Sequence, residues 1–304
     1  MTVNTASAKP VRFRKAKIWT GPQIVLTLCV LFFALICVIP FINIIARSFS
    51  SKSALLKGAV YFAPVEFTTK AYQVIFRDKS LLHCLGYTVE ITVLYTAIAM
   101  ILTILMAYPL TKKRLAGRKI FSFIAMFTMY FSGGTIPIFL NIKSLHLYDT
   151  MWALILPGAL STYNMIILKS FFAALPGELE EAATIDGAND FQILVRIYLP
   201  LSLASIATLV LFYAVGKWNS FQDALYYIQT RDLQPLQLRL YNLIKGSTAV
   251  EISMQEGNAN SLASEVSESI EPATILFATL PILVVYPFVQ RYFVAGVTLG
   301  AVKG

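Results

Sequence analysis

The chain has 304 residues, of which 57% are hydrophobic and 13% are charged, and its mean hydropathy is +0.67. Soluble proteins carry about 25% charged residues, so this composition excludes an ordinary soluble domain. The apolar residues occur in runs of about the 20 residues that a helix needs to cross a bilayer. We therefore expect an all-α integral membrane protein.

Six transmembrane spans are predicted in chain order, at about 22–46, 85–110, 120–142, 150–172, 200–220 and 272–294. The third and fourth are the weakest, because Gly133-Gly134 interrupts the one and Pro157-Gly158 interrupts the other. The three tryptophans fall at predicted span ends, where aromatic side chains meet the lipid headgroups: Trp19, Trp152 and Trp218. The spans define a transmembrane domain at 22–296.

Dense clusters of basic residues indicate which side of the membrane each segment faces. They lie in the N-terminal tail and between the second and third spans: Lys9, Arg12, Arg14, Lys15, Lys17, then Lys112, Lys113, Arg114, Arg118, Lys119. Such clusters stay in the cytoplasm. An even number of spans then puts the tails 1–21 and 297–304 and the connection 173–199 inside, and the polar segments 47–84 and 221–271 outside. The net charge of +9 thus reflects topology, and we expect no nucleic-acid partner, because the clusters lie at helix ends.

The sequence contains no pattern typical of an enzyme or a cofactor site. There is no GxxxxGK[ST] loop to hold a nucleotide and no nucleophile–base arrangement. The cysteines and histidines are isolated and form neither a CxxC pair nor a set of metal ligands: Cys29, Cys37, Cys84, His83 and His146. We therefore expect no active site, and no metal or cofactor bound by this chain.

Residues 173–199 are predicted to form an elbow of two short helices. Pro176 suits the first helical turn, and the glutamates that follow it suit the positive end of the helix dipole. Gly187 breaks the first helix, and Asn189 or Asp190 can cap the second. Four apolar residues at helical spacing are expected to form one stripe of the second helix: Phe191, Leu194, Val195 and Tyr198. An ordinary connector lying on the membrane surface is the alternative.

The elbow resembles the signature of permease subunits of binding-protein-dependent ABC importers. That signature is EAA, three residues, Gly, nine residues and I-x-LP, and it matches without a gap at Glu181-Ala182-Ala183, Gly187, Ile197 and Leu199-Pro200. The segments FSGGTIPIFL, DTMWALILP and QRYFVAGVTLGAVKG are similar to the carbohydrate branch, and within it to the smaller six-span partner of a maltose-type pair. The resemblance implies a type I ABC importer permease fold in a bacterial cytoplasmic membrane.

The resemblance also implies partners. In that family the elbow is a coupling helix that seats on a cytoplasmic ATPase. Carried over by position, the docking residues would be Glu181, Ala182, Ala183, Asp186, Gly187, Ala188 and Asn189. The expected partners are a second permease in a heterodimer, two ATPase subunits that bind ATP and Mg, an extracellular solute-binding protein that touches the 221–271 loop, and membrane lipid.

The translocation pathway is predicted from breaks in the spans. Irregular backbone at membrane depth is tolerated where it lines a cavity or is buried in protein. The resemblance adds the Trp-Asn pair at the end of the fifth span. The candidates are Tyr130, Gly133, Gly134, Tyr163, Asn164, Trp218 and Asn219. Packing between helices is the alternative for each of them.

The transported solute is expected to be an oligosaccharide, and FSGGTIP is similar to permeases for plant or algal sugars, including uronic-acid types. A phosphorylated polyol or another polar solute is the alternative within the family. An ion-coupled secondary transporter is a third possibility, but it would need paired ionisable residues deep in the spans. In the sequence only Lys169 lies far into an apolar run, near its cytoplasmic end, which favours ATP-driven import.

Overall fold

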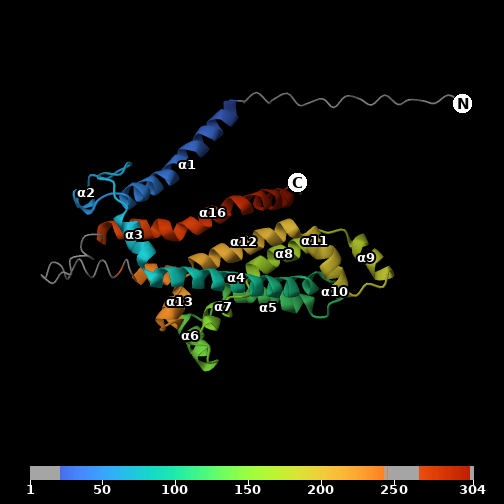
Figure 1. Ribbon diagram of the computed structural model, residues 1–304. Helices are drawn as coiled ribbons and strands as arrows, with labels where there is room; N and C mark the ends of the chain where they lie inside the picture. Colours follow the sequence, from blue (N-terminus) through green and yellow to red (C-terminus); the bar gives the residue numbers. More distant parts are fainter. Residues whose placement is uncertain (1–20, 243–244, 246–266, 302–304) are drawn as a thin grey trace.

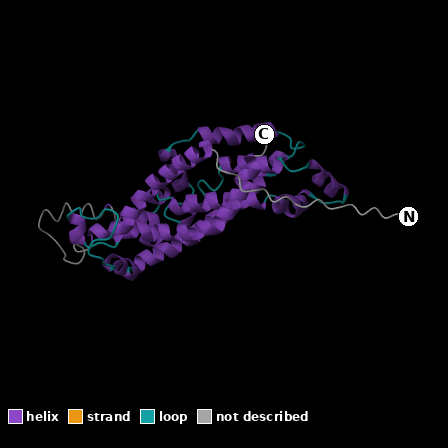
Figure 2. Ribbon diagram, turned by 90° about the horizontal axis from the view of Figure 1, so that it is seen from above, coloured by secondary structure: helices purple, strands orange, loops and turns teal. Residues whose placement is uncertain are grey.

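The computed structural model describes residues 21–242, 245 and 267–301. Every regular element in these ranges is helical, as the composition predicts (Figure 2). Three predicted features lie outside the described residues: the basic cluster of the N-terminal tail, the acidic half of the outer loop and the end of the C-terminal tail.

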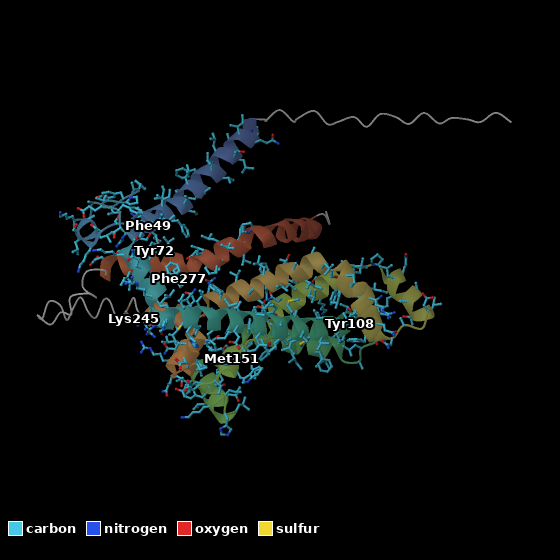
Figure 3. All side chains as sticks on the ribbon, in the orientation of Figure 1. Phe49, Tyr72, Tyr108, Met151, Lys245 and Phe277 are labelled. Carbon is cyan, nitrogen blue, oxygen red and sulfur yellow. The ribbon has the colours of Figure 1, made fainter. Side chains whose placement is uncertain are left out.

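The first helix, α1 (Gly21–Ser48), leans away from the other helices (Figure 1). Its most apolar stretch is not buried against any described residue. Ala46 and Ser48, near its C-terminal end, are buried. There the chain continues into α2 (Lys52–Leu56) and α3 (Lys70–Arg77). The rings of Phe49 and Tyr72, 4.8 Å apart, pack at this junction (Figure 3).

Three helices form the centre of the bundle: α4 (Lys79–Ala107), α12 (Leu203–Asn219) and α16 (Ser267–Ala301). Figure 1 shows them running side by side with α8 (Thr162–Ala173). Asp78 starts α4, because its carboxylate accepts the otherwise unpaired backbone N–H of Ser80 at 2.8 Å. The hydroxyls of Thr103 and Tyr213, 2.7 Å apart, join α4 to α12 inside the core.

The third predicted span is a bent helix pair, and the fifth begins at a second bend, which joins it to the end of the predicted elbow. α5 (Arg118–Tyr130) meets α6 (Thr135–Ser144) at 115°, and Gly134 at the break has a φ of 86° that favours glycine. α12 is preceded at 83° by a run of short pieces: α10 (Asp190–Ile193), η2 (Leu194–Tyr198) and α11 (Leu199–Leu201).

The predicted fourth span is divided between α7 (Met151–Ile155) and α8, with Pro157 and Gly158 in the linker between them. Gly158 has a φ of 79°, which a side chain would strain. The described residues therefore contain three helices long and apolar enough to cross a membrane, or up to five if each bent pair is one span, against the six predicted.

Polar and irregular segments collect at the two ends of the bundle (Figure 1). One end carries α9 (Gly177–Ile185) and α10, together with η1 (Pro109–Thr111) at the end of α4. The opposite end carries α2, α3, α6, α7, α13 (Gln222–Tyr227) and η3 (Arg231–Leu233). These two ends hold the candidate sites.

Candidate functional site

The elbow has the two short helices that its sequence predicts. α9 ends through bonds from the Gly187 and Ala188 backbone N–H groups to Thr184 and Ala183, at 3.1 and 2.9 Å. Gly187 has a φ of 82°, a left-handed conformation that glycine adopts at no steric cost. Asn189 then caps α10 in a reciprocal capping box with Gln192. Both helix ends are satisfied locally, so the elbow is a defined bend.

The elbow turns one face of α9 to the surroundings. No residue of α9 is buried, and Glu181, Ala182 and Asp186 are all exposed. Ala183 and Ala188, by contrast, are partly buried and pack against the core. Of the seven predicted docking residues, these two thus face the bundle, while the exposed ones remain candidates for contact with a partner.

Two apolar residues extend this exposed face, and the sequence analysis missed them. Ile185 is 86% exposed and Leu179 is also exposed. With Ala182 they recur at every third position of α9, which was the available signal in the sequence. We call Leu179, Glu181, Ala182 and Ile185 the knuckle.

A buried lysine ties the elbow to the end of α4. The Lys112 side chain is 8% exposed, and its Nζ lies 2.7 Å from Glu180 Oε2 and 3.2 Å from the Tyr198 hydroxyl oxygen. Tyr198 donates to the same Glu180 oxygen at 2.8 Å. The rings of Tyr108 and Tyr198 also lie 4.1 and 4.3 Å from Nζ (Tyr108 in Figure 3). Two of the three donors of this ammonium group therefore reach oxygens, and its charge faces two aromatic rings.

The same contacts set the charge of the glutamate. Burial by itself raises the pKa of Glu180, but the hydrogen bonds from Lys112 and Tyr198 and the Lys112 charge outweigh burial, so that the pKa lies below its usual value. Lys112 belongs to the basic cluster that predicts topology. Its buried role could not be read from that cluster.

A second ion pair joins the same two segments at the surface. Arg114 donates to Asp190, the first residue of α10, and both side chains are more than half exposed. The connection after α4 is thus attached to the elbow twice, once in a buried site and once in water.

The second helix of the elbow differs from the predicted amphipathic stripe. Leu194 and Tyr198 are buried as expected, but Phe191 and Val195 are exposed, and Ile193 is buried in their place. The segment from Leu194 to Tyr198 is wound as a π-helix. The stripe assumes 3.6 residues per turn, whereas the wider π turn pairs residues five apart, which aligns Ile193 with Tyr198 on the buried face.

Two predicted pathway tyrosines come from neighbouring helix ends. Tyr130 ends α5 and is 79% exposed, and Tyr163 in the first turn of α8 is also exposed. The Thr128 and Thr162 hydroxyls, 3.5 Å apart, bring these ends together. The exposed Gly133 and Gly134 follow Tyr130 directly, whereas Asn164 is buried.

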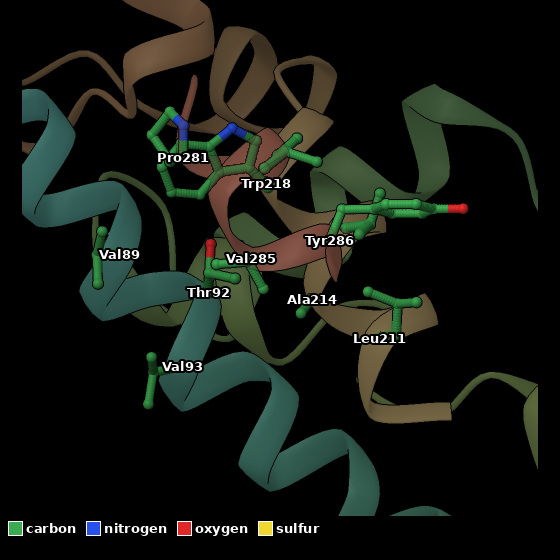
Figure 4. A pocket seen from close by; sticks show the side chains of 11 residues that line it. Val89, Thr92, Val93, Leu211, Ala214, Trp218, Pro281, Val285 and Tyr286 are labelled. Atoms are coloured by element: carbon green, nitrogen blue, oxygen red, sulfur yellow. The ribbon is translucent and has the colours of Figure 1, made fainter. Parts of the chain in front are cut away.

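Trp218 and Asn219 lie at the end of α12, apart from the two pathway tyrosines. The Trp218 indole N–H donates to the Ala278 carbonyl oxygen of α16 at 3.2 Å. Its ring borders an apolar cavity of about 220 Å³ between α4, α12 and α16, together with Val89 and Thr92 (Figure 4). Asn219 is exposed and donates to Val215 in its own helix. This geometry favours helix packing for Trp218, and the seven pathway residues stay predictions.

A polar cavity at the end opposite the elbow contains a second buried lysine that the sequence analysis missed. It has a volume of about 330 Å³ and is lined by residues that include Tyr95, Gly158, Lys217, Asp223 and Tyr227. The Lys217 side chain is 8% exposed, and its Nζ lies 3.5 Å from Asp223 Oδ2. The signal in the sequence was a lysine directly before the tryptophan that marks the end of the fifth predicted span.

Asp149 supports one wall of this cavity. Its backbone N–H donates to the Tyr227 carbonyl oxygen at 2.9 Å. Its carboxylate accepts the backbone N–H groups of Gln229 and Thr230 and the Thr230 hydroxyl, at 2.7–2.9 Å. These hydrogen bonds, led by those from Thr230, lower the pKa of Asp149. The loop before α7 is thereby fixed to the segment after α13.

Comparison with known proteins gives one consistent picture. Residues 92–299 match the family described as "Binding-protein-dependent transport system inner membrane component". The polygalacturonan/rhamnogalacturonan transport system permease protein YtcP of Bacillus subtilis (strain 168) is 45% identical over 274 residues, which cover 90% of this chain and 95% of that protein. Protein LplC of the same organism is 44% identical, with coverage of 88% and 90%.

The solved structures agree with these sequence matches. The chain is similar to one in the crystal structure of a bacterial ABC transporter involved in the import of the acidic polysaccharide alginate. The TM-score is 0.81 at 32% identity, and the match covers 91% of this chain and all of the other.

Proposed function

The chain belongs to the family of binding-protein-dependent transport system inner membrane components, and from this premise we propose that it forms half of the translocation pathway of an ATP-driven importer for an acidic oligosaccharide. It is a permease subunit and not an enzyme, and its helical fold is that of type I ABC permeases. In this proposal ATP and Mg bind to a separate ATPase, and this chain supplies the membrane path.

The observation that carries the proposal is an exposed knuckle on a rigid elbow. Leu179, Ala182 and Ile185 present apolar surface beside the Glu181 carboxylate. A small apolar face with one charge fits a cleft that has a basic group at its edge. Because Gly187 and the Asn189 cap fix the bend, a partner that grips the knuckle moves the whole elbow.

Motion of the elbow then has a direct route to the membrane helices. Glu180 in α9 meets Lys112 at the end of α4, and Tyr198 leads through η2 and α11 into α12. Closure of the ATPase pair would pull on α4 and α12 together. Such a linkage favours one of two states of the pathway, inward-open or outward-open.

The other proposed partners are membrane lipid, a second permease subunit and a solute-binding protein, and they are supported by the family match and by exposed surfaces of this chain. The apolar length of α1, unburied within the described chain, suits contact with lipid and with a second permease subunit. α1 begins and α16 ends toward the side that carries α9 (Figure 1), which supports termini on the ATPase side of a bacterial cytoplasmic membrane. A solute-binding protein would deliver the solute at the opposite end, where residues 221–242, the described first part of the predicted outer loop, lie.

The acidic substrate rests on relatives whose names mention polygalacturonan, rhamnogalacturonan and alginate. A phosphorylated polyol is a weaker candidate, since none of the relatives named above has a polyol in its name. An ion-coupled secondary transporter is disfavoured by the family match.

Mild affinity purification of the chain from its native membranes, followed by mass identification, tests the proposal. We expect a second permease and an ATPase to co-purify, and expect the ATPase to be lost from a Glu181→Lys variant. An Asp232→Lys variant, which reverses an exposed carboxylate in η3 at the opposite end of the bundle, serves as the charge control. Recovery of a single chain that transports solute in vesicles without ATP would contradict the proposal.

A further inference from the structure

The polar cavity opposite the elbow is built where the membrane helices are broken. Its lining combines Tyr95 of α4, Gly158 of the α7–α8 linker, Lys217 of α12, and Asp223 and Tyr227 of α13. The Tyr95 hydroxyl donates to the Gly158 carbonyl oxygen at 2.9 Å, so the linker is held in place as part of the wall. Irregular backbone at membrane depth is tolerated where it lines such a cavity.

Lys217 is the chemical centre of this cavity. Ionisable residues within membrane helices are costly to bury and commonly mark a substrate path. An ammonium group has three donors. In the described part of the chain, the acceptor within reach is Asp223, at a loose 3.5 Å, and the Tyr95 ring centre lies 5.0 Å away. Lys112, equally buried, has two oxygens and two aromatic rings nearer than this.

We propose that this cavity is a station on the translocation pathway, at which Lys217 receives the carboxylate of an acidic sugar unit. Asp223 holds the ammonium group while the cavity is empty. The incoming carboxylate replaces it, and the partly exposed Asp223 turns to water, so that no buried charge is left unpaired. A volume of about 330 Å³ suits one sugar unit rather than a long chain.

The exchange explains why the pair is loose. A transport site must bind its solute well enough to admit it and weakly enough to release it. Replacing one carboxylate by another yields a small net gain, whereas an unpaired buried lysine would hold an acid too tightly. The inference rests on the proposed function, because it needs a solute that passes through this chain.

The test uses the complete transporter in proteoliposomes: this chain with its partner permease, the ATPase and the binding protein. The probes are digalacturonate and its uncharged methyl ester, which have the same sugar skeleton. We expect Lys217→Gln to reduce digalacturonate uptake at least about tenfold relative to the ester, the loss typical of one charged hydrogen bond. Lys217→Arg should keep the preference for the acid.

Two further variants separate a binding role from a structural one. Lys143→Gln changes an exposed lysine on the neighbouring α6 and should leave the preference unchanged. Asp223→Asn removes the competing carboxylate and should strengthen the preference. An equal loss of both probes in Lys217→Gln would show that the lysine only stabilises the fold, and would overturn the inference.

The wild-type transporter distinguishes the two proposals. Uptake of the ester as fast as the acid would overturn the role of Lys217 and leave ATP-driven import intact. Absence of any ATP-dependent uptake, in a complex that contains all its subunits, would instead contradict the proposed function itself.

Discussion

Two lysines, one at each end of the bundle, are equally buried and differently satisfied. The Lys112 Nζ lies 2.7 Å from Glu180, donates to the Tyr198 hydroxyl oxygen as a second partner and lies over two aromatic rings. Lys217 lies 3.5 Å from Asp223 beside an open polar cavity. Burial alone therefore does not separate a structural charge from a binding charge. The number and distance of the partners separate them. Two of the three Lys112 donors reach oxygens within 3.2 Å and its charge faces two rings, whereas within the described residues Lys217 has one carboxylate, at 3.5 Å.

The largest effect is expected at the buried ion pair of Lys112 and Glu180. Lys112→Met leaves the Glu180 carboxylate without its partner in a partly buried site, and removing one member of a buried ion pair costs about 3–5 kcal/mol. We expect a large drop in the thermal stability of the purified complex, and transport that falls while the ATPase still turns over. Lys112→Arg, which keeps the charge, should restore part of both. Unchanged stability in Lys112→Met would mean that the pair does not hold the elbow.

The knuckle should give the next largest effect, on coupling rather than on stability. Glu181→Lys reverses the exposed charge that is proposed to meet the ATPase, and Gly187→Pro alters the bend where φ is 82°. Pro cannot adopt a positive φ. Both variants are expected to insert in the membrane normally and to lose ATP-driven uptake or the bound ATPase. Normal transport at normal expression in both variants would contradict the proposal that the knuckle contacts the ATPase.

At the end opposite the elbow, acid should loosen the wall that Tyr227 shares with the Asp149 loop. The folded-state pKa of Asp149 is lowered, so its stabilising contribution is present above the unfolded-state pKa and is lost as the pH falls through the folded-state value. Hydrogen exchange at the Gln229 and Thr230 amides, corrected for the intrinsic exchange rate at each pH, should therefore rise selectively only below about pH 3.8. Asp149→Asn should remove this pH dependence; a wild-type exchange pattern in that variant would rule out the carboxylate as its source.

The smallest effect is expected at the exposed pair beside the elbow. Arg114 and Asp190 join the same segments as Lys112 and Glu180, but water surrounds both side chains. Exposed ion pairs contribute about 0–1 kcal/mol. Arg114→Met should therefore change thermal stability and coupling little, and it is the matched control for Lys112→Met. If Arg114→Met lost as much stability and coupling as Lys112→Met, the surface pair would have to be the contact that holds the elbow.

The elbow was largely predictable because its signals are local. Gly187 ends the first helix in a left-handed backbone conformation that glycine adopts without strain. Asn189 caps the helix that follows. Neither preference depends on the surrounding structure. The stripe was half wrong, since the π turn from Leu194 to Tyr198 depends on packing and not on the periodicity of the apolar residues.

What the sequence determined by itself was the membrane class, the family and the elbow, because apolar length, basic clusters and a contiguous motif are all properties of neighbouring residues. The tertiary structure decided which charges meet. Lys112 and Glu180 are 68 residues apart, and Lys217 lines one cavity with Tyr95 and Gly158 from distant parts of the chain. No local pattern marks such contacts, because a charge is paired or left available by the helices that fold around it.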